Sequence, residues 1–163
     1  MTDTAAPAQK TPRYWYEDFP VGKEWALTPV TLTRESIIAF ARDYDPQPFH
    51  LDDAAGEASL FGALAASGWQ TCALAHRMLC DVVILDMAGL GSPGVDNIKW
   101  LKPVLVGDTI SGRAIVTEAR LMKSRPGIGL VCVRTEIVNQ KGELVLTMSG
   151  WTIIRQRRAA PAS

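Results

Sequence analysis

Cysteine is scarce in this sequence, and its few copies form no recognisable metal or redox motif. The three cysteines, Cys72, Cys80 and Cys132, form no CxxC motif, and an odd number of thiols cannot all form disulfides within the chain. This excludes a disulfide framework of the kind that small secreted domains use and fits a reducing cytoplasm. Histidine is rarer still, because His50 and His76 are the only two copies. Two histidines and unpaired thiols give no metal-ligand pattern, so we expect no bound metal.

The chain also lacks an excess of charge and a long apolar run. Its 17 basic side chains balance 17 acidic ones, so no net field attracts a polyanion, and we expect no nucleic-acid partner. No run approaches the roughly 18 apolar residues that a membrane helix needs. Residues 1–12 lack the apolar centre of a signal peptide. We therefore expect a soluble, cytoplasmic protein that has no membrane partner.

No internal repeat, linker or composition shift divides the chain. Its 163 residues, 47% of them hydrophobic, suit one domain with a core of its own. We place this domain at residues 13–156. The stretches 1–12 and 157–163, rich in alanine and proline, are expected to be disordered tails.

Apolar residues at helical spacing predict a helix that leads into a proline-rich segment. Thr33 is a residue type that caps helix N-termini. The periodic residues after it are Ile37, Phe40, Ala41 and Tyr44. Pro46 and Pro48 follow, and each proline disfavours helical backbone at the residue before it. We expect the helix to end near Tyr44 and the next segment to be extended.

A second helix and a series of strands make up the rest of the predicted core. Residues 69–85 are apolar on nearly every face, which predicts a helix buried all round. Turn signals separate the segments rich in Val, Ile, Leu and Thr, which predict strands at 24–32, 95–101, 109–121, 128–139 and 143–154. Gly89 to Gly94 matches G-x-G-x-x-G but lies in no βαβ unit, so we interpret it as a loop. The pattern predicts an α+β fold with a mostly antiparallel sheet around one long central helix.

The segment Asp45-Pro46-Gln47-Pro48-Phe49-His50 places an acid and an imidazole five residues apart across two prolines. A carboxylate that can accept a proton and an imidazole that titrates near neutrality can add or remove water across a double bond. For either residue alone, a solvated aspartate or a surface histidine at a helix end is the simpler interpretation. For the rigidly spaced pair this interpretation is weaker, and a catalytic site stays open beside it.

This segment resembles the hydratase motif Asp-x-Asn-Pro-x-His of the MaoC-like (R)-specific enoyl-CoA hydratases. Ser67-Gly68 before the apolar helix, and the stretch from Trp100 to Asp108, resemble two further parts of that family. The resemblance covers residues 13–156 and implies the hot dog fold, in which a sheet wraps one long helix. It also implies that subunits pair, so we expect a homodimer or a larger oligomer built from dimers, with acyl-CoA sites near the subunit interface.

The activity implied by the resemblance is that of a hydro-lyase, the reversible hydration of a trans-2-enoyl-CoA to an (R)-3-hydroxyacyl-CoA. Coenzyme A is then part of the substrate, and no separate cofactor is expected. Asp45 and His50 hold one water molecule in this scheme; Asp45 takes its proton, and His50 delivers a proton toward C2. Gly68 is the expected backbone oxyanion donor, because negative charge is favoured at a helix N-terminus.

Two departures from the family pattern bear on substrate binding. Gln47 stands where the motif has Asn, and Ser67 stands where a His is usual, but both changes leave the acid and the imidazole in place. We expect seven side chains to contact the acyl group or coenzyme A: Gln47, Ser67, Trp69, Cys72, His76, Asn97 and Lys99. Inert packing of Cys72 and His76, and plain solvation of Lys99, remain open alternatives.

Two other functions remain open for the same fold. A hot dog thioesterase typically places its carboxylate on the central helix, where Asp81 and Asp86 lie toward the far end. Such an enzyme releases a free thiol. A catalytically silent subunit, suggested by Gln47, binds acyl-CoA without converting it.

Overall fold

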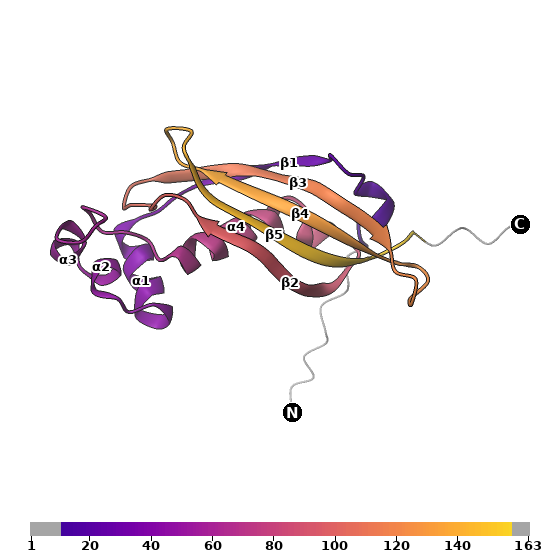
Figure 1. Ribbon diagram of the computed structural model, residues 1–163, viewed down its shortest axis with the longest axis horizontal. Helices are drawn as coiled ribbons and strands as arrows, with labels where there is room; N and C mark the ends of the chain where they lie inside the picture. Colours follow the sequence, from indigo (N-terminus) through magenta and orange to yellow (C-terminus); the bar gives the residue numbers. More distant parts are fainter. Residues whose placement is uncertain (1–10, 158–163) are drawn as a thin grey trace, which may run out of the picture.

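The computed structural model describes residues 11–157, which form a single sheet and several helices (Figure 1). The helices are α1 (Arg34–Tyr44), α2 (Pro48–Leu51), α3 (Asp53–Glu57) and α4 (Gly68–Val82), with short 3₁₀ turns at Tyr16–Asp18 and Ile84–Asp86. The strands are β1 (Glu24–Thr31), β2 (Gly89–Trp100), β3 (Thr109–Leu121), β4 (Ile128–Val138) and β5 (Leu144–Arg155). Apart from residues 11, 12 and 157, the predicted tails lie outside the described residues.

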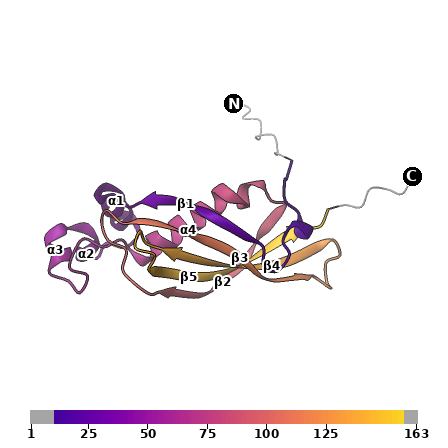
Figure 2. The same cartoon turned by 90° about the horizontal axis from the view of Figure 1, so that it is seen from above.

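The sheet has the strand order β1-β3-β4-β5-β2, and every neighbouring pair is antiparallel. Seen from above, α4 lies along one face of this curved sheet, while α1, α2 and α3 gather beyond one end (Figure 2). The predicted antiparallel sheet around one long helix is confirmed. Within residues 11–157 no helix has the length and apolar character needed to cross a membrane.

Helix α4 is buried on one side, not all round as its composition predicted. Its inward face consists of positions about one turn apart, namely Thr71, Ala75, Met78 and Leu79. Trp69, His76 and Arg77 are exposed on the other side. A single sheet can cover only one face of a helix, which leaves the opposite face of α4 exposed.

The glycine-rich segment from Gly89 to Gly94 is part of β2, so the loop interpretation was wrong. The ladder between β2 and β5 shifts register between Gly89 and Gly91 and again between Gly91 and Gly94. Irregular pairing of this kind accommodates the positive φ angles of Gly91 and Gly94, which are +132° and +157°. An edge strand also tolerates Pro93, whose missing N–H needs no partner there.

The predicted helix before the proline segment is confirmed as α1. Thr33 caps it by accepting a hydrogen bond from the Ser36 N–H at 3.2 Å. Ile37 and Ala41 are buried, as the spacing predicted, but Tyr44 is 73% exposed because it lies in the last turn, beyond the core. The backbone is extended only briefly, since Pro48 starts α2, where its missing N–H costs no helical bond.

Candidate active site

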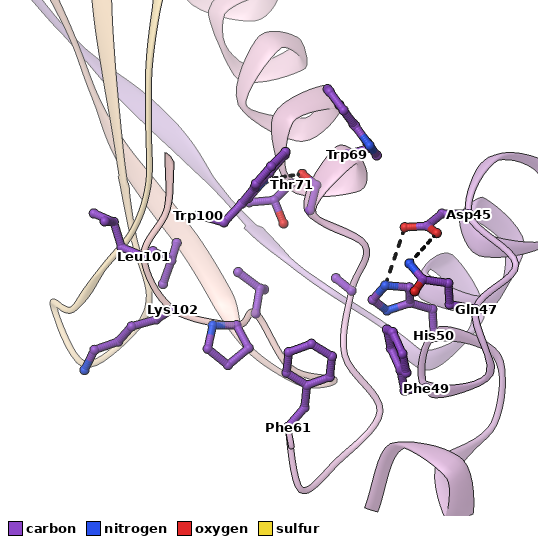
Figure 3. A pocket seen from close by; sticks show the side chains of 15 residues that line it. Asp45, Gln47, Phe49, His50, Phe61, Trp69, Thr71, Trp100, Leu101 and Lys102 are labelled. Atoms are coloured by element: carbon purple, nitrogen blue, oxygen red, sulfur yellow. Dashed lines mark hydrogen bonds and ion pairs between the residues drawn. The ribbon is translucent and has the colours of Figure 1, made fainter. Parts of the chain in front are cut away.

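A cavity of about 430 Å³ opens where the start of α4 meets α1 and α2 (Figure 3). Asp45, Gln47 and His50 stand on one wall, and Trp100, Leu101 and Lys102 stand on the opposite wall. The remaining lining residues are Phe49, Phe61, Ala66, Gly68, Trp69, Thr71, Pro103, Val104 and Val145. A pocket that is largely apolar with a few convergent polar groups is the usual form of a ligand site.

Asp45 is the C-cap residue of α1, and its carboxylate is held by two side-chain donors. The Ser67 hydroxyl donates to Oδ2 at 2.7 Å, and the Gln47 amide donates to Oδ1 at 2.8 Å. The backbone is also tied down, because the Gln47 N–H donates to the Asp45 carbonyl at 2.8 Å. The side chain is only 17% exposed. Its orientation is therefore fixed from both oxygens and from the main chain.

These contacts set the ionisation of Asp45. Burial acts to raise the pKa of its carboxyl, but the hydrogen bonds from Ser67 and Gln47 and the charge of His50 outweigh burial and leave the pKa below the usual value. Asp45 is consequently a carboxylate at neutral pH. It is ready to accept a proton.

His50 is buried in α2 with 4% of its surface exposed, and its ring tautomer follows from one contact. Nδ1 lies 2.7 Å from the Ala65 carbonyl oxygen, which can only accept a hydrogen bond, so Nδ1 carries a proton. Ala65 itself is held firmly, since its N–H donates to the Phe49 carbonyl at 3.2 Å. Nε2 is therefore the nitrogen that gains and loses a proton.

Nε2 of His50 faces Oδ2 of Asp45 at 3.5 Å. This separation exceeds the usual length of a hydrogen bond. With His50 neutral, a lone pair on Nε2 faces an anionic oxygen. Nε2 and Oδ2 are then both acceptors, so they favour a molecule between them that donates a hydrogen bond to each.

Ser67 and Gly68 bring the first turn of α4 to the same cavity. Ser67 is completely buried and is the N-cap of α4, since its hydroxyl accepts from the Trp69 N–H at 3.1 Å. Helix geometry gives no intrahelical acceptor to the first N–H groups, including that of Gly68. Gly68 lines the cavity, and a Cβ there would lie 2.7 Å from the Trp100 ring. Only glycine fits at this position beside that ring.

Of the other residues predicted to bind substrate, Trp69 lines the cavity and the remaining four do not. Cys72 is half-buried beside Trp100, and burial raises the pKa of its thiol. His76 lines a separate cavity of about 350 Å³ with Met87 and Ser92. Asn97 and Lys99 are exposed on β2. For these four residues a role in substrate binding stays a prediction.

The aromatic residues around His50 were missed as cavity residues. Phe61 stacks on His50 with 19° between the ring planes, and Phe49 meets both rings edge-on. Phe49 lies within the proline-braced motif, so its position beside His50 offered a signal, whereas Phe61 follows a loop that no periodicity describes. Trp100 belongs to a stretch that resembled the family, but resemblance alone does not predict that its ring reaches the start of α4.

No three histidine, cysteine, aspartate or glutamate side chains among residues 11–157 gather where they could hold a metal ion. The carboxylates on and after α4 also lie elsewhere. Asp81 is paired with Arg77 at 2.8 Å on the outer face of α4, and neither Asp81 nor Asp86 lines the cavity of Asp45 and His50.

The sequence pattern of the MaoC like domain matches residues 18–138, which is most of the chain. The chain belongs to this family. Its structure resembles that of the MaoC-like dehydratase from Rhodospirillum rubrum with a TM-score of 0.83. The two sequences are 34% identical, and the match covers 90% of this chain and 99% of that one.

Two further proteins are similar to parts or all of this MaoC-like chain. The mesaconyl-CoA hydratase of Cereibacter sphaeroides is 43% identical over 79 residues, which are 48% of this chain and 23% of that enzyme. A Mycobacterium tuberculosis protein with a double hotdog fold matches with a TM-score of 0.74 and 19% identity, over 92% of this chain and 46% of that one. The latter likeness shows the fold alone. The predicted α+β hot dog fold is confirmed.

Proposed function

We propose that this protein is a hydro-lyase that reversibly hydrates a trans-2-enoyl-CoA to an (R)-3-hydroxyacyl-CoA. Membership of the MaoC-like family supports this reaction class. The main structural support is the 3.5 Å separation between Nε2 of His50 and Oδ2 of Asp45 inside a cavity. A water molecule offering one hydrogen atom to each acceptor fits this pair, and water is the molecule that a hydratase must activate.

In the hydration direction, the O–H bond of this water breaks as its oxygen forms a bond to C3 of the enoyl group. Asp45 accepts the released proton, which its lowered pKa permits because the carboxylate is ionised at neutral pH. That proton passes across the short gap to Nε2 of the neutral His50, which then gives it to C2. Both members of the pair thereby return to their starting protonation states.

Negative charge develops on the thioester oxygen as water adds to C3. A donor aimed at that oxygen before the reaction stabilises the transition state, an effect worth about 3–4 kcal/mol when one oxyanion donor is removed. We assign this role to the Gly68 N–H, at the positive end of the α4 dipole and on the cavity wall. Coenzyme A is the carrier in this scheme and needs no further cofactor.

The decisive experiment follows the loss of enoyl-thioester absorbance with crotonyl-CoA and longer enoyl-CoA substrates. We expect Asp45→Asn to lower kcat by about 100-fold to 10,000-fold, the usual contribution of a positioned acid or base. Asp81→Asn, on the outer face of α4, is the matched control and should keep wild-type kcat. Wild-type turnover by Asp45→Asn would rule out this assignment.

The same assay separates the hydratase from the two alternatives. A thioesterase would release free coenzyme A, which a thiol reagent detects. A silent subunit would bind acyl-CoA in calorimetry without changing its absorbance. Neither Asp81 nor Asp86 lines the cavity, so neither carboxylate is placed to act as the thioesterase group there.

We also propose that the protein works as a homodimer, or as a larger oligomer built from dimers. Strand β2 is a sheet edge and exposes Leu90, Val95 and Trp100, each at least 42% accessible. The other edge, β1, has no large hydrophobic side chain with comparable exposure among the described residues. Unpaired edges with exposed apolar side chains are common sites of association, so β2 is the edge at which we expect a second copy.

A further inference from the structure

Trp100 connects the sheet to the start of the central helix through two independent contacts. Its indole N–H donates to the Gly68 carbonyl at 2.8 Å, across 32 residues of sequence. Its ring meets the Trp69 ring edge-on, with centroids 5.3 Å apart. Two positions in the first turn of α4 are thus held by one side chain, as Figure 3 shows for Trp69 and Trp100.

The backbone of Trp100 is itself well anchored in the sheet. Trp100 pairs with Leu146 of β5, and the next residue, Leu101, donates its N–H to the Val145 carbonyl at 2.8 Å. A carbonyl oxygen has two lone pairs, so the Gly68 carbonyl can accept from the indole as well as from the N–H one turn later in α4. The contact therefore adds to the helix without replacing a helical hydrogen bond.

The lack of a side chain at Gly68 is matched to this ring. A Cβ at Gly68 would lie 2.7 Å from both Cε2 and Nε1 of Trp100, closer than real Cβ contacts allow. The ring thus occupies the space next to the peptide groups of the first turn. Since Trp100 and Asp45 stand on opposite walls, the ring also fixes how far that turn lies from the sheet side of the cavity.

We infer that Trp100 is a positioning residue, whose indole N–H holds the first turn of α4 so that the Gly68 N–H points at the thioester oxygen. This inference rests on the proposed function, because it gives the Gly68 N–H its target. It assigns Trp100 no contact with the reacting atoms. Loss of the indole N–H should loosen the turn and leave the acid and imidazole in place.

The first test is Trp100→Phe, which keeps an aromatic ring and removes the N–H donor. We expect kcat to fall by about tenfold to 100-fold with little change in KM, because small misplacement of a catalytic group costs rates of this size. The acid limb of the pH–rate profile should stay in place, since Asp45 keeps both of its donors. Trp151→Phe makes the same chemical change on β5, outside the cavity, and should leave kcat unchanged.

The second test is a double-mutant cycle with Gly68→Ala, which displaces the ring by direct contact. In that background the turn is already released, so adding Trp100→Phe should lower kcat by less than about threefold. Equal effects of Trp100→Phe in both backgrounds would overturn the inference. So would wild-type kcat in Trp100→Phe alone.

Amide hydrogen exchange makes the inference testable without turnover. Trp100→Phe should speed exchange at Trp69 and Thr71 relative to wild type and to Trp151→Phe, because the hydrogen bonds from these amides to Ser67 open more often when the turn is loose. Unchanged exchange in Trp100→Phe would overturn the role of the indole. If the wild-type protein fails to hydrate any enoyl-CoA while exchange still rises, the proposed function is wrong and the positioning of the turn stands.

Discussion

Ser67 links the start of α4 to the carboxylate of Asp45. Its hydroxyl donates to Asp45 and accepts from the Trp69 N–H, so one buried group both holds the carboxylate and caps α4. A hydroxyl has one hydrogen atom, and the Ser67 hydrogen is used on the carboxylate. Substitution at this position therefore has two separable effects, one on ionisation and one on stability.

We predict that Ser67→Ala moves the acid limb of the pH–rate profile to higher pH. The native carboxyl of Asp45 has a lowered pKa, so activity that needs the carboxylate is present above that pKa and is lost as pH falls through it. Removing a donor to the charged form raises the pKa, and the loss then begins at a less acidic pH. The measurement is kcat/KM for crotonyl-CoA across the acid range. An unmoved limb would contradict the contact.

Two companion variants separate ionisation from capping. Gln47→Ala removes the other donor to Asp45 and keeps the cap, so it should move the limb in the same direction without destabilising α4. Thr33→Ala removes the N-cap of α1, which makes no contact with Asp45. It should lower the unfolding free energy by about 1 kcal/mol, as cap losses do, and leave the limb where it is.

The sequence was enough to predict that Asp45 and His50 lie together, but not which groups hold them in place. The spacing of Asp45 and His50 across two prolines indicated a pair, because stiff backbone limits where the two side chains can go. The Ala65 carbonyl that fixes the His50 tautomer carries no side-chain signal at all. The partner of Nδ1 depends on how residues 64–66 lie against residues 104–106, which only tertiary structure shows.

At the scale of secondary-structure elements, the segment from Leu64 to Ala66 supports His50 from behind. The Ala66 N–H donates to the Val104 carbonyl, and the Val106 N–H donates to the Leu64 carbonyl, at 2.8 and 2.9 Å. Helix α3 packs against the same segment at Gly56, which is buried. Small shifts in α3 therefore reach His50 through Ala65.

We predict that Gly56→Ala lowers both stability and turnover, although Gly56 touches neither member of the pair. A Cβ there would lie 2.6 Å from the Leu64 N and 2.7 Å from the Ala63 carbonyl oxygen, and backbone atoms must move to admit it. Overpacking of this kind costs about 1–3 kcal/mol. Chemical denaturation and kcat measure the two effects. Gly150→Ala, with nothing within 4 Å of its Cβ, should change neither, and a fully active Gly56→Ala would contradict this coupling.

Element boundaries and burial were harder to predict than element types. The richness of β3, β4 and β5 in Val, Ile, Leu and Thr, with turn signals between them, indicated strands, and all three formed. The glycines of β2 resembled a loop because their positive φ angles suit turns, but backbone pairing with β5 overrides that local preference. The composition of α4 indicated burial without indicating which partner provides it.

At the scale of the whole molecule, one sheet and one long helix leave the Trp69 ring of α4 and an apolar sheet edge uncovered. The exposed side chains are Trp69 on α4, which is 56% exposed, and Val95 and Leu90 on β2, which are 50% and 42% exposed. Association that covers such surface also removes an edge strand from solvent. These observations agree with the proposed homodimer, which sequence reasoning reached only through family resemblance.

We predict that Val95→Lys shifts the protein from dimer to monomer. The substitution places a charge at the centre of the β2 edge, where a pairing strand would bury it, and an unpaired buried charge strongly opposes association. Sedimentation velocity at micromolar concentration measures the mass against the 17.7 kDa of one chain. Val21→Lys changes an even more exposed valine outside β2 and should leave the mass unaltered. A dimeric Val95→Lys would exclude this edge.

Because the Ser67 hydroxyl both bonds Asp45 and caps α4, acid should disturb the N-terminus of α4 before it disturbs the rest of the fold. When Asp45 takes up a proton that is not passed on, the bond from Ser67 loses its charge assistance, and the serine is freer to leave the tip of α4. The N-terminus of α4 should then fray over the same acidic pH range in which activity is lost. Both changes should occur at a higher pH than the unfolding of the sheet.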